Sequence, residues 1–183
     1  LVDVIVDHAG MKGTGTWTVQ TALSLAVPVT GIAEAVFARG LSSEADLREE
    51  AQKQGFAGPS GELNLNDEEK KAFIEDIRQA LYASKIVAYA QGFNEITTAA
   101  KEHGWDIDLA AVARIWRGGC IIRAKFLNRI SEAFESGEAN VSLLFAPYFK
   151  NAIETAEKSW RNVVAQAAIN GLPTPAFASS LSY

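Results

Sequence analysis

The sequence predicts an all-α fold: one multi-helix domain over residues 1–183, with one very long helix. Alanine has the highest helix propensity, and it is the commonest residue, at 30 of 183. Apolar residues recur at helical intervals through long stretches, and few segments alternate in the way that is typical of a half-buried strand. Hydrophobic residues make up 48% and charged residues 21%, which is ordinary for a folded globular domain.

The first third of the chain is predicted to contain three short helices. The expected order is an extended segment at 1–7, a glycine-rich loop at 9–16, and helices at 17–26, at 28–40 and up to about 55. Pro28 suits the start of the second helix, because its missing N–H needs no partner there. Ser42 and Ser43 are candidate N-caps of the third helix. Residues 55–66 are rich in turn-forming residues and are predicted to be a linker.

The longest helical pattern runs from Asp67 to about His103, which is 37 residues. Asp67 is predicted to cap it, acidic residues fill its first turn, and Gly104 supplies a stop. At 1.5 Å per residue this helix is about 55 Å long. Its apolar positions spread over more than one face, so we expect part of it to pack against a partner subunit.

The remaining segments also predict helices. They are expected at 108–117, at 120–136, at 147–171 and from Pro173 or Pro175 onward. The last of them stops at Tyr183 without a capping residue, and the chain does not begin with Met. We therefore interpret the sequence as a piece of a longer chain.

Composition argues against several classes of protein. The formal net charge is −5, and no basic region is typical of a nucleic-acid-binding protein. No apolar run approaches the ~20 residues of a membrane span, and no signal peptide opens the chain. Cys120 is the one cysteine, so neither an intrachain disulfide nor a zinc cluster is expected, and no metal is predicted. A reducing, cytoplasmic location follows as an expectation.

The segment from Gly10 to Trp17 is the strongest candidate for chemistry. Its glycines let backbone N–H groups approach an anion, and it leads into a helix start, where the dipole also favours an anion. Lys12 adds a positive charge and Thr14 a hydroxyl donor. The glycine spacing imitates a P-loop, but Lys-Ser/Thr does not follow and no βαβ pattern surrounds it, so we reject that interpretation. The alternative is a tight loop whose glycines serve geometry alone.

Other charged residues give weaker signals. Arg39, in the last turn of a helix, is typical of a dipole partner or a solvated charge. Arg117 and Arg123 either bind an acid or pair with carboxylates of the chain, and structural use is the favoured alternative. Cys120 is predicted to be a small buried residue. No metal-binding or catalytic partner is visible in the sequence for the two histidines, at positions 8 and 103.

Four blocks together resemble one family. They are Asp7–Trp17 (DHAGMKGTGTW), Glu34–Arg39 (EAVFAR), Phe73–Phe93 in the long helix, and Trp116–Arg123 (WRGGCIIR). In this order they resemble the 6-phosphogluconate dehydrogenases, the decarboxylating oxidoreductases of the pentose phosphate pathway. The resemblance covers essentially the whole chain.

The resemblance implies a larger enzyme with an N-terminal Rossmann domain, an all-helical domain and a C-terminal tail that reaches into the other subunit of a homodimer. This chain is similar to most of the helical domain only, and it lacks the G-x-G-x-x-G motif of a dinucleotide site. NADP would therefore be bound mainly by the absent domain. The catalytic lysine and glutamate of the family would lie upstream, so no catalytic or cofactor-binding residue is expected here, and the isolated chain should be inactive.

What remains is the phosphate end of the substrate site. The resemblance implies that Lys12, Thr14 and Arg39 bind the phosphate of 6-phosphogluconate, and that the rest of the chain supplies the dimer interface. Three positions depart from the family pattern. Met11 replaces a polar residue, Thr16 stands where many members carry lysine, and Gly40 where many carry cysteine or tyrosine.

Two alternatives stay open. The first is a non-catalytic helical dimerisation module without a nucleotide domain. The second is a related β-hydroxyacid dehydrogenase that acts on another acid; those relatives have a shorter helical domain, and the Lys-Gly-Thr-Gly loop is not expected in them.

Overall fold

The computed structural model describes residues 4–59 and 63–183, and within them it contains helices and no strand. The all-α prediction is therefore confirmed. The helices, in order, are α1 Thr14–Ser24, α2 Thr30–Ser42, α3 Ala45–Lys53, α4 Asp67–His103, α5 Leu109–Ile115, α6 Leu127–Glu135, the short 3₁₀-helix η2 Leu143–Phe145, α7 Pro147–Ile169 and α8 Pro175–Ser182.

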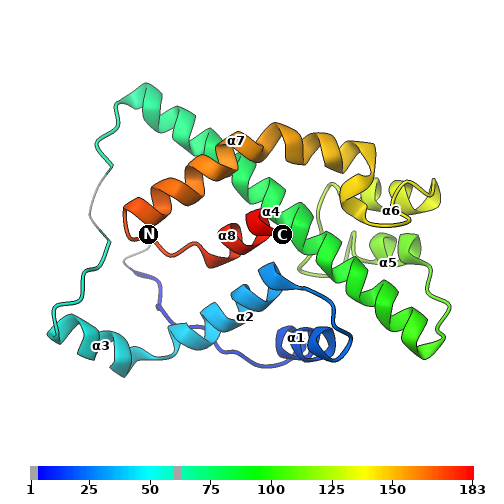
Figure 1. Ribbon diagram of the computed structural model, residues 1–183, viewed down its shortest axis with the longest axis horizontal. Coiled ribbons are helices and arrows are strands. Elements are labelled where there is room, and N and C mark those ends of the chain that lie inside the picture. Colours follow the sequence, from blue (N-terminus) through cyan, green and yellow to red (C-terminus); the bar gives the residue numbers. More distant parts are fainter. Residues whose placement is uncertain (1–3, 60–62) are drawn as a thin grey trace.

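The long helix α4 is the spine on which the other elements assemble (Figure 1). α7 crosses it and makes its most extensive contact, while α5 and α6 pack on each other near its C-terminal half. α2 and α8 form a third pair against the middle of α4. The largest core cluster is built on Phe149, Ile86 and Leu127, and a second surrounds Trp160 on α7.

The predicted length of α4 is confirmed, but its cap is one residue earlier than predicted. The side-chain oxygen of Asn66 accepts hydrogen bonds from the N–H groups of Glu68 and Glu69, both at 3.0 Å. The Glu69 carboxylate in turn accepts from the Asn66 N–H at 2.9 Å, which completes a capping box. At the other end Gly104 adopts φ 67°, a left-handed conformation that glycine reaches without strain.

A buried glutamine joins α4 to α2. Gln91 is completely buried; its Oε1 accepts from the Gly31 N–H at 3.1 Å and its Nε2 donates to Thr30 Oγ1 at 3.0 Å. The first of these bonds satisfies the Gly31 N–H in the opening turn of α2, which begins at Thr30 and not at Pro28 as predicted. A Cβ at Gly31 would lie 2.5 Å from Ser180 Oγ, so glycine is what lets α8 approach α2.

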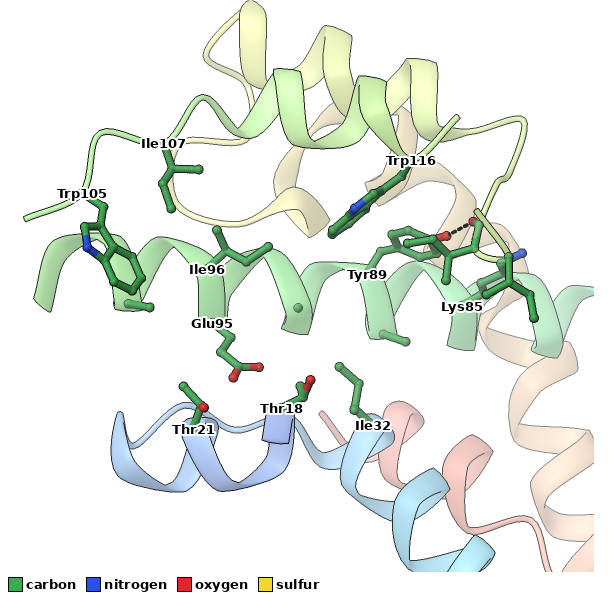
Figure 2. Close-up of a pocket in the computed structure, with 15 residues that line it drawn as sticks. Thr18, Thr21, Ile32, Lys85, Tyr89, Glu95, Ile96, Trp105, Ile107 and Trp116 are labelled. Atoms are coloured by element: carbon green, nitrogen blue, oxygen red, sulfur yellow. Dashed lines mark hydrogen bonds between the residues drawn. The ribbon is translucent and has the colours of Figure 1, made fainter. Parts of the chain in front are cut away.

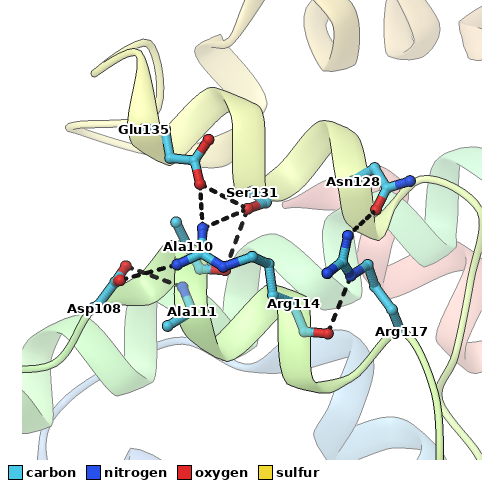
Figure 3. Close-up of polar contacts among 8 residues, drawn as sticks. All are labelled: Asp108, Ala110, Ala111, Arg114, Arg117, Asn128, Ser131 and Glu135. Atoms are coloured by element: carbon cyan, nitrogen blue, oxygen red, sulfur yellow. Dashed lines mark hydrogen bonds and ion pairs between the residues drawn. The ribbon is translucent and has the colours of Figure 1, made fainter.

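Figure 3 shows the polar network that joins α5 to α6. Asp108 caps α5 by accepting from the Ala111 N–H at 3.0 Å, and its other oxygen pairs with Arg114 at 3.1 Å. Arg114 also pairs with Glu135 and donates to Ser131, both on α6. The Ala111 N–H is the main reason that the pKa of Asp108 lies below its ordinary value. One arginine therefore fixes the relative position of two short helices.

The predicted helix at 120–136 is wrong in its first half. Residues 117–126 form turns and irregular backbone, and α6 begins only at Leu127. Gly119 adopts φ 74°, and the Ile122 carbonyl accepts a hydrogen bond from the Tyr89 hydroxyl on α4. That tertiary bond engages a carbonyl that a helix would use internally.

Two side chains of this loop region also differ from expectation. Arg117 donates to Asn128 Oδ1 at 3.0 Å and to the Arg114 carbonyl at 3.2 Å, so its partners are neutral oxygens and not carboxylates (Figure 3). Cys120 is half-buried, not buried, and its thiol lies 3.1 Å from the Trp116 carbonyl.

The N-terminal elements shift relative to prediction. α1 begins at Thr14, three residues before the predicted start, and Glu44 precedes α3 in place of a serine cap. Ser42 instead donates to the Arg39 carbonyl at 2.6 Å. Residues 4–7 form no strand, and the rest of the predicted extended segment lies outside the described residues. In the described ranges, no helix combines the length and the apolar character needed to cross a bilayer.

Candidate functional site

The glycine-rich loop leads directly into α1, as the sequence predicted. Gly13 has φ 89° and precedes the first helical residue, Thr14. No side chain caps this end, and no acidic residue occupies its first turn. The backbone N–H groups that open a helix have no partner within it, so this end presents donors and the positive end of the helix dipole.

The structure brings Lys12, Thr14 and Arg39 together around one cavity of about 150 Å³. Lys12 and Thr14 come from the loop and the first residue of α1, and Arg39 comes from the last turn of α2. All three are exposed, and neither cation forms an ion pair within the described part of the chain. The cavity therefore combines two positive charges, a hydroxyl and a helix N-terminus with no carboxylate on its walls.

Two hydrogen bonds hold the loop against α2. Arg39 Nε donates to the Gly10 carbonyl at 2.8 Å, and the Ala9 N–H donates to Ser42 Oγ at 2.9 Å. α1 and α2 also approach closely, since a Cβ at Gly15 would lie 3.1 Å from Val36 Cγ2. The position of Arg39 relative to Lys12 therefore depends on the Gly10 carbonyl and on the absence of a side chain at Gly15.

The sequence interpretation did not single out Thr16 as a site residue. Thr16 lines the same cavity, and its Oγ1 is buried with no hydrogen-bond partner in the described residues. A buried hydroxyl without a partner costs free energy unless a ligand or solvent supplies one. The sequence did contain one indication of this role, because Thr16 lies two residues after Thr14, at the start of a predicted helix.

Met11 and Gly40, two of the departures noted above, touch each other. A Cβ at Gly40 would lie 3.2 Å from Met11 Sδ, so the methionine occupies space that a larger residue at position 40 would need. Met11 also lines the cavity. The two departures are therefore coupled in space, and Met11 with Val36 gives the cavity apolar side chains.

The donor set suits an oxyanion. Cations and neutral N–H and O–H donors at a helix start are the groups that bind phosphate in proteins. The described residues contain no group of His, Cys, Asp or Glu side chains that could hold a metal ion. They also contain no strand, so they do not form the strand–loop–helix unit that binds a dinucleotide.

Comparison with known proteins identifies the family. The model of the 6-phosphogluconate dehydrogenase C-terminal domain matches residues 1–183. A decarboxylating 6-phosphogluconate dehydrogenase of Schizosaccharomyces pombe is 50% identical over 183 residues, covering all of this chain and 36% of the relative. The Homo sapiens enzyme of the same name is 48% identical, with 37% of its length covered.

A solved structure agrees. The 6-phosphogluconate dehydrogenase of Plasmodium falciparum superposes on the whole chain with a TM-score of 0.92 at 37% sequence identity. That protein is described in its apo form and in complex with its cofactor NADP⁺ and its substrate 6-phosphogluconate. The match covers 39% of it, so the chain spans roughly two fifths of the proteins that it resembles. The chain belongs to the family of 6-phosphogluconate dehydrogenase C-terminal domains.

Proposed function

We propose that residues 1–183 are the helical, substrate-binding and dimerisation domain of a full-length decarboxylating 6-phosphogluconate dehydrogenase. The reaction converts 6-phosphogluconate to ribulose 5-phosphate and CO₂, a step of the pentose phosphate pathway. The names of the relatives support this activity. The contribution that we propose for this chain is substrate binding and part of the dimer interface. We expect a cytoplasmic enzyme.

In this proposal Lys12, Thr14 and Arg39 bind the substrate phosphate. The single observation that supports it is that residues from two separate helices line one small cavity at the start of α1. Two cations suit a phosphate dianion, and the hydroxyl groups of Thr14 and Thr16 add neutral donors. The orphaned Thr16 hydroxyl extends the proposed set by one residue.

Binding of the phosphate contributes to catalysis because it positions the rest of the substrate. The phosphate is remote from C3, the carbon whose hydroxyl is oxidised before CO₂ is lost. Binding energy at the remote group can hold C3 in the reactive geometry and so serve the chemical step. NADP⁺ supplies the hydride acceptor, and we place its site, and the catalytic base and acid, in the part of the enzyme outside these residues.

We further propose a homodimer in which this domain supplies much of the interface. The long helix supports this, because Ile74 and Leu81 on it remain exposed, at 65% and 56%. With Ile77 between them, these side chains form a row on one face of the helix, and a contiguous exposed apolar patch marks a protein–protein interface. A chain whose fold depends on that contact has a stability that rises with protein concentration.

The test of the proposed activity is NADPH absorbance with the full-length protein, given 6-phosphogluconate and NADP⁺. Lys12→Ala is expected to raise KM by about 10–100-fold, the value of one charge-assisted hydrogen bond. Lys158→Ala is the matched control, because Lys158 is an exposed lysine on α7 away from the cavity. An intact, folded protein that forms no NADPH contradicts the activity, and an unchanged KM in the Lys12 variant contradicts the phosphate site.

A further inference from the structure

A second cavity with a basic lining lies where the loop after α5 meets the start of α6. It has a volume of about 400 Å³, which is typical of a small-molecule site, and we refer to it below as the basic cavity. Its lining residues are Arg117, Arg123, Ala124, Lys125 and Asn128. Three of these five are cations and none is a carboxylate, although the whole chain has a net charge of −5. The basic cavity shares no lining residue with the phosphate cavity at the start of α1.

The described part of the chain does not neutralise these three cations. Arg123 and Lys125 form no hydrogen bond and no ion pair with any described residue. Arg117 donates from Nε and from one terminal nitrogen to two neutral oxygens, one of them on Asn128 (Figure 3). Its other terminal nitrogen has no partner among the described residues, so all three side chains can donate to a ligand.

The carboxylates of α6, which borders the basic cavity, have other partners. Glu132 pairs with Arg129 at 2.8 Å, and Glu135 pairs with Arg114. The sequence left two uses open for the arginines of the loop, namely binding an acid and pairing with carboxylates of the chain. Pairing is not realised among the described residues, so binding an acid is the use that remains.

The backbone around the basic cavity is held in place by bonds within the fold. The Tyr89 hydroxyl on α4 donates to the Ile122 carbonyl, as Figure 2 shows, and the Leu127 N–H donates to the Ala124 carbonyl at 3.2 Å. α6 begins at Leu127 with no side-chain cap and no acidic residue in its first turn, to which Asn128 belongs. The N–H groups that open this helix therefore add donors and a positive dipole end beside the three cations.

A cavity lined by charges of one sign attracts ions of the opposite sign and raises their local concentration. Guanidinium groups bind phosphate through two parallel N–H donors, and an ammonium group adds a point charge. The phosphate cavity offers two cations around about 150 Å³, whereas the basic cavity offers three around about 400 Å³. The larger volume and charge suit a ligand with more than one phosphate group.

We propose that the basic cavity binds a small molecule that carries two phosphate groups, at a site separate from the one that binds the substrate phosphate. Arg123 and Lys125 supply the charge that is free of other contacts, and Arg117 supplies a further donor. The inference goes beyond the proposed reaction and does not depend on it. Carboxylates from polypeptide outside residues 1–183 are the competing source of negative charge.

The test is isothermal titration calorimetry of inorganic pyrophosphate with the full-length protein. A Lys12→Ala background weakens the phosphate cavity, and saturating NADP⁺ occupies the dinucleotide site. In this background Arg123→Ala should raise the Kd for pyrophosphate by at least about tenfold, the value of one charge-assisted contact. Arg161→Ala, at an exposed arginine of α7 that does not line the basic cavity, is the matched control and should change Kd by less than about twofold. An unchanged Kd in the Arg123→Ala protein overturns the proposal.

Thermal melts of the same proteins distinguish the two sources of negative charge. A bound ligand stabilises the fold, so pyrophosphate should raise the melting temperature of the parent and should raise it less in Arg123→Ala and Lys125→Ala. Without pyrophosphate, neither variant should melt lower than the parent, because neither side chain has a partner in the described residues. If carboxylates of the longer protein fill the basic cavity, the parent binds no pyrophosphate there and both variants melt lower, which overturns the proposal. The readouts need no turnover, so their failure is distinguishable from failure of the proposed function.

Discussion

Arg39 Nε donates a hydrogen bond to the carbonyl oxygen of Gly10 over 2.8 Å. The bond links the last turn of α2 to the loop that precedes α1, although the two residues lie 29 positions apart in the chain. It engages one nitrogen of the guanidinium, and the two terminal nitrogens have no partner within the described ranges. Arg39 can therefore fix the loop and still present donors to the cavity.

This double role predicts that lysine cannot replace Arg39. In the full-length protein, Arg39→Ala should raise KM for 6-phosphogluconate by about 10–100-fold through loss of a charge-assisted contact. Arg39→Lys keeps the charge, but its single nitrogen cannot serve the Gly10 carbonyl and a ligand together, so we expect at least about a tenfold rise. Steady-state kinetics measures both, with Arg129→Lys on α6 as the control. A lysine variant with the original KM would refute the double role.

Met11 and Gly40 should show energetic coupling. Glycine within a helix costs roughly 0.5–1 kcal/mol relative to alanine, so Gly40→Ala should stabilise α2 by that amount where space allows. Next to Met11 Sδ, 3.2 Å from the added Cβ, part of this gain is lost. In a Met11→Ala background the gain should be complete. Urea unfolding of the four proteins in the cycle measures the coupling, and an identical effect of Gly40→Ala in both backgrounds would show that the contact is unimportant.

Gln91→Leu should lower the free energy of unfolding by about 1–3 kcal/mol, because the buried Gly31 N–H loses its acceptor. Leucine fills much of the space, so a lost hydrogen bond is the main effect. Gln20→Leu, at an exposed position of α1, is the matched control and should change the stability by less than about 0.5 kcal/mol. Equal effects of the two substitutions in urea would mean that the buried amide is not what holds α2 to α4.

Asp108 provides a pH-dependent prediction. Asp108→Ala should lower the melting temperature by about 2–4 °C through loss of the α5 cap and the Arg114 pair. Asp108→Asn keeps an acceptor for the Ala111 N–H, so it should lower the melting temperature by less than Asp108→Ala does. Because the pKa of Asp108 is depressed in the fold, its stabilisation is present above its ordinary value of 3.8 and is lost as the pH falls through the lower folded value. The gap between wild type and Asp108→Asn should therefore close below pH 3.8 in thermal melts. A gap independent of pH would exclude the charge as its cause.

The sequence predicted the helices whose ends are set by neighbouring residues, and it failed where a contact with a distant residue is involved. The bounds of α4 follow from acidic residues in its first turn and from Gly104 after its last, and both act within one turn of the helix. The segment from Cys120 to Phe126 could not be predicted in this way, because the hydrogen bond that its Ile122 carbonyl accepts comes from Tyr89 on another helix and leaves no local signal in the sequence.

Some residues of the phosphate cavity could be predicted from the sequence and others could not. Lys12 and Thr14 follow from the chemistry of a glycine loop before a helix. Arg39 is ordinary on its own, and only the family resemblance assigned it to the phosphate. No sequence pattern shows that the end of α2 returns to the loop, since that approach depends on close packing at Gly15. The buried Thr16 hydroxyl was likewise invisible until the walls of the cavity were known.

The central claim, that Lys12, Thr14 and Arg39 recognise the substrate's phosphate, is tested most directly by comparing two substrates in the full-length protein. The kcat/KM of wild type and Lys12→Ala is measured with 6-phosphogluconate and with gluconate, which lacks the phosphate. The proposed site predicts a fall of about 10–100-fold for 6-phosphogluconate and a change of less than about twofold for gluconate. Equal falls for both substrates would contradict it, because Lys12 would then act on something other than the phosphate.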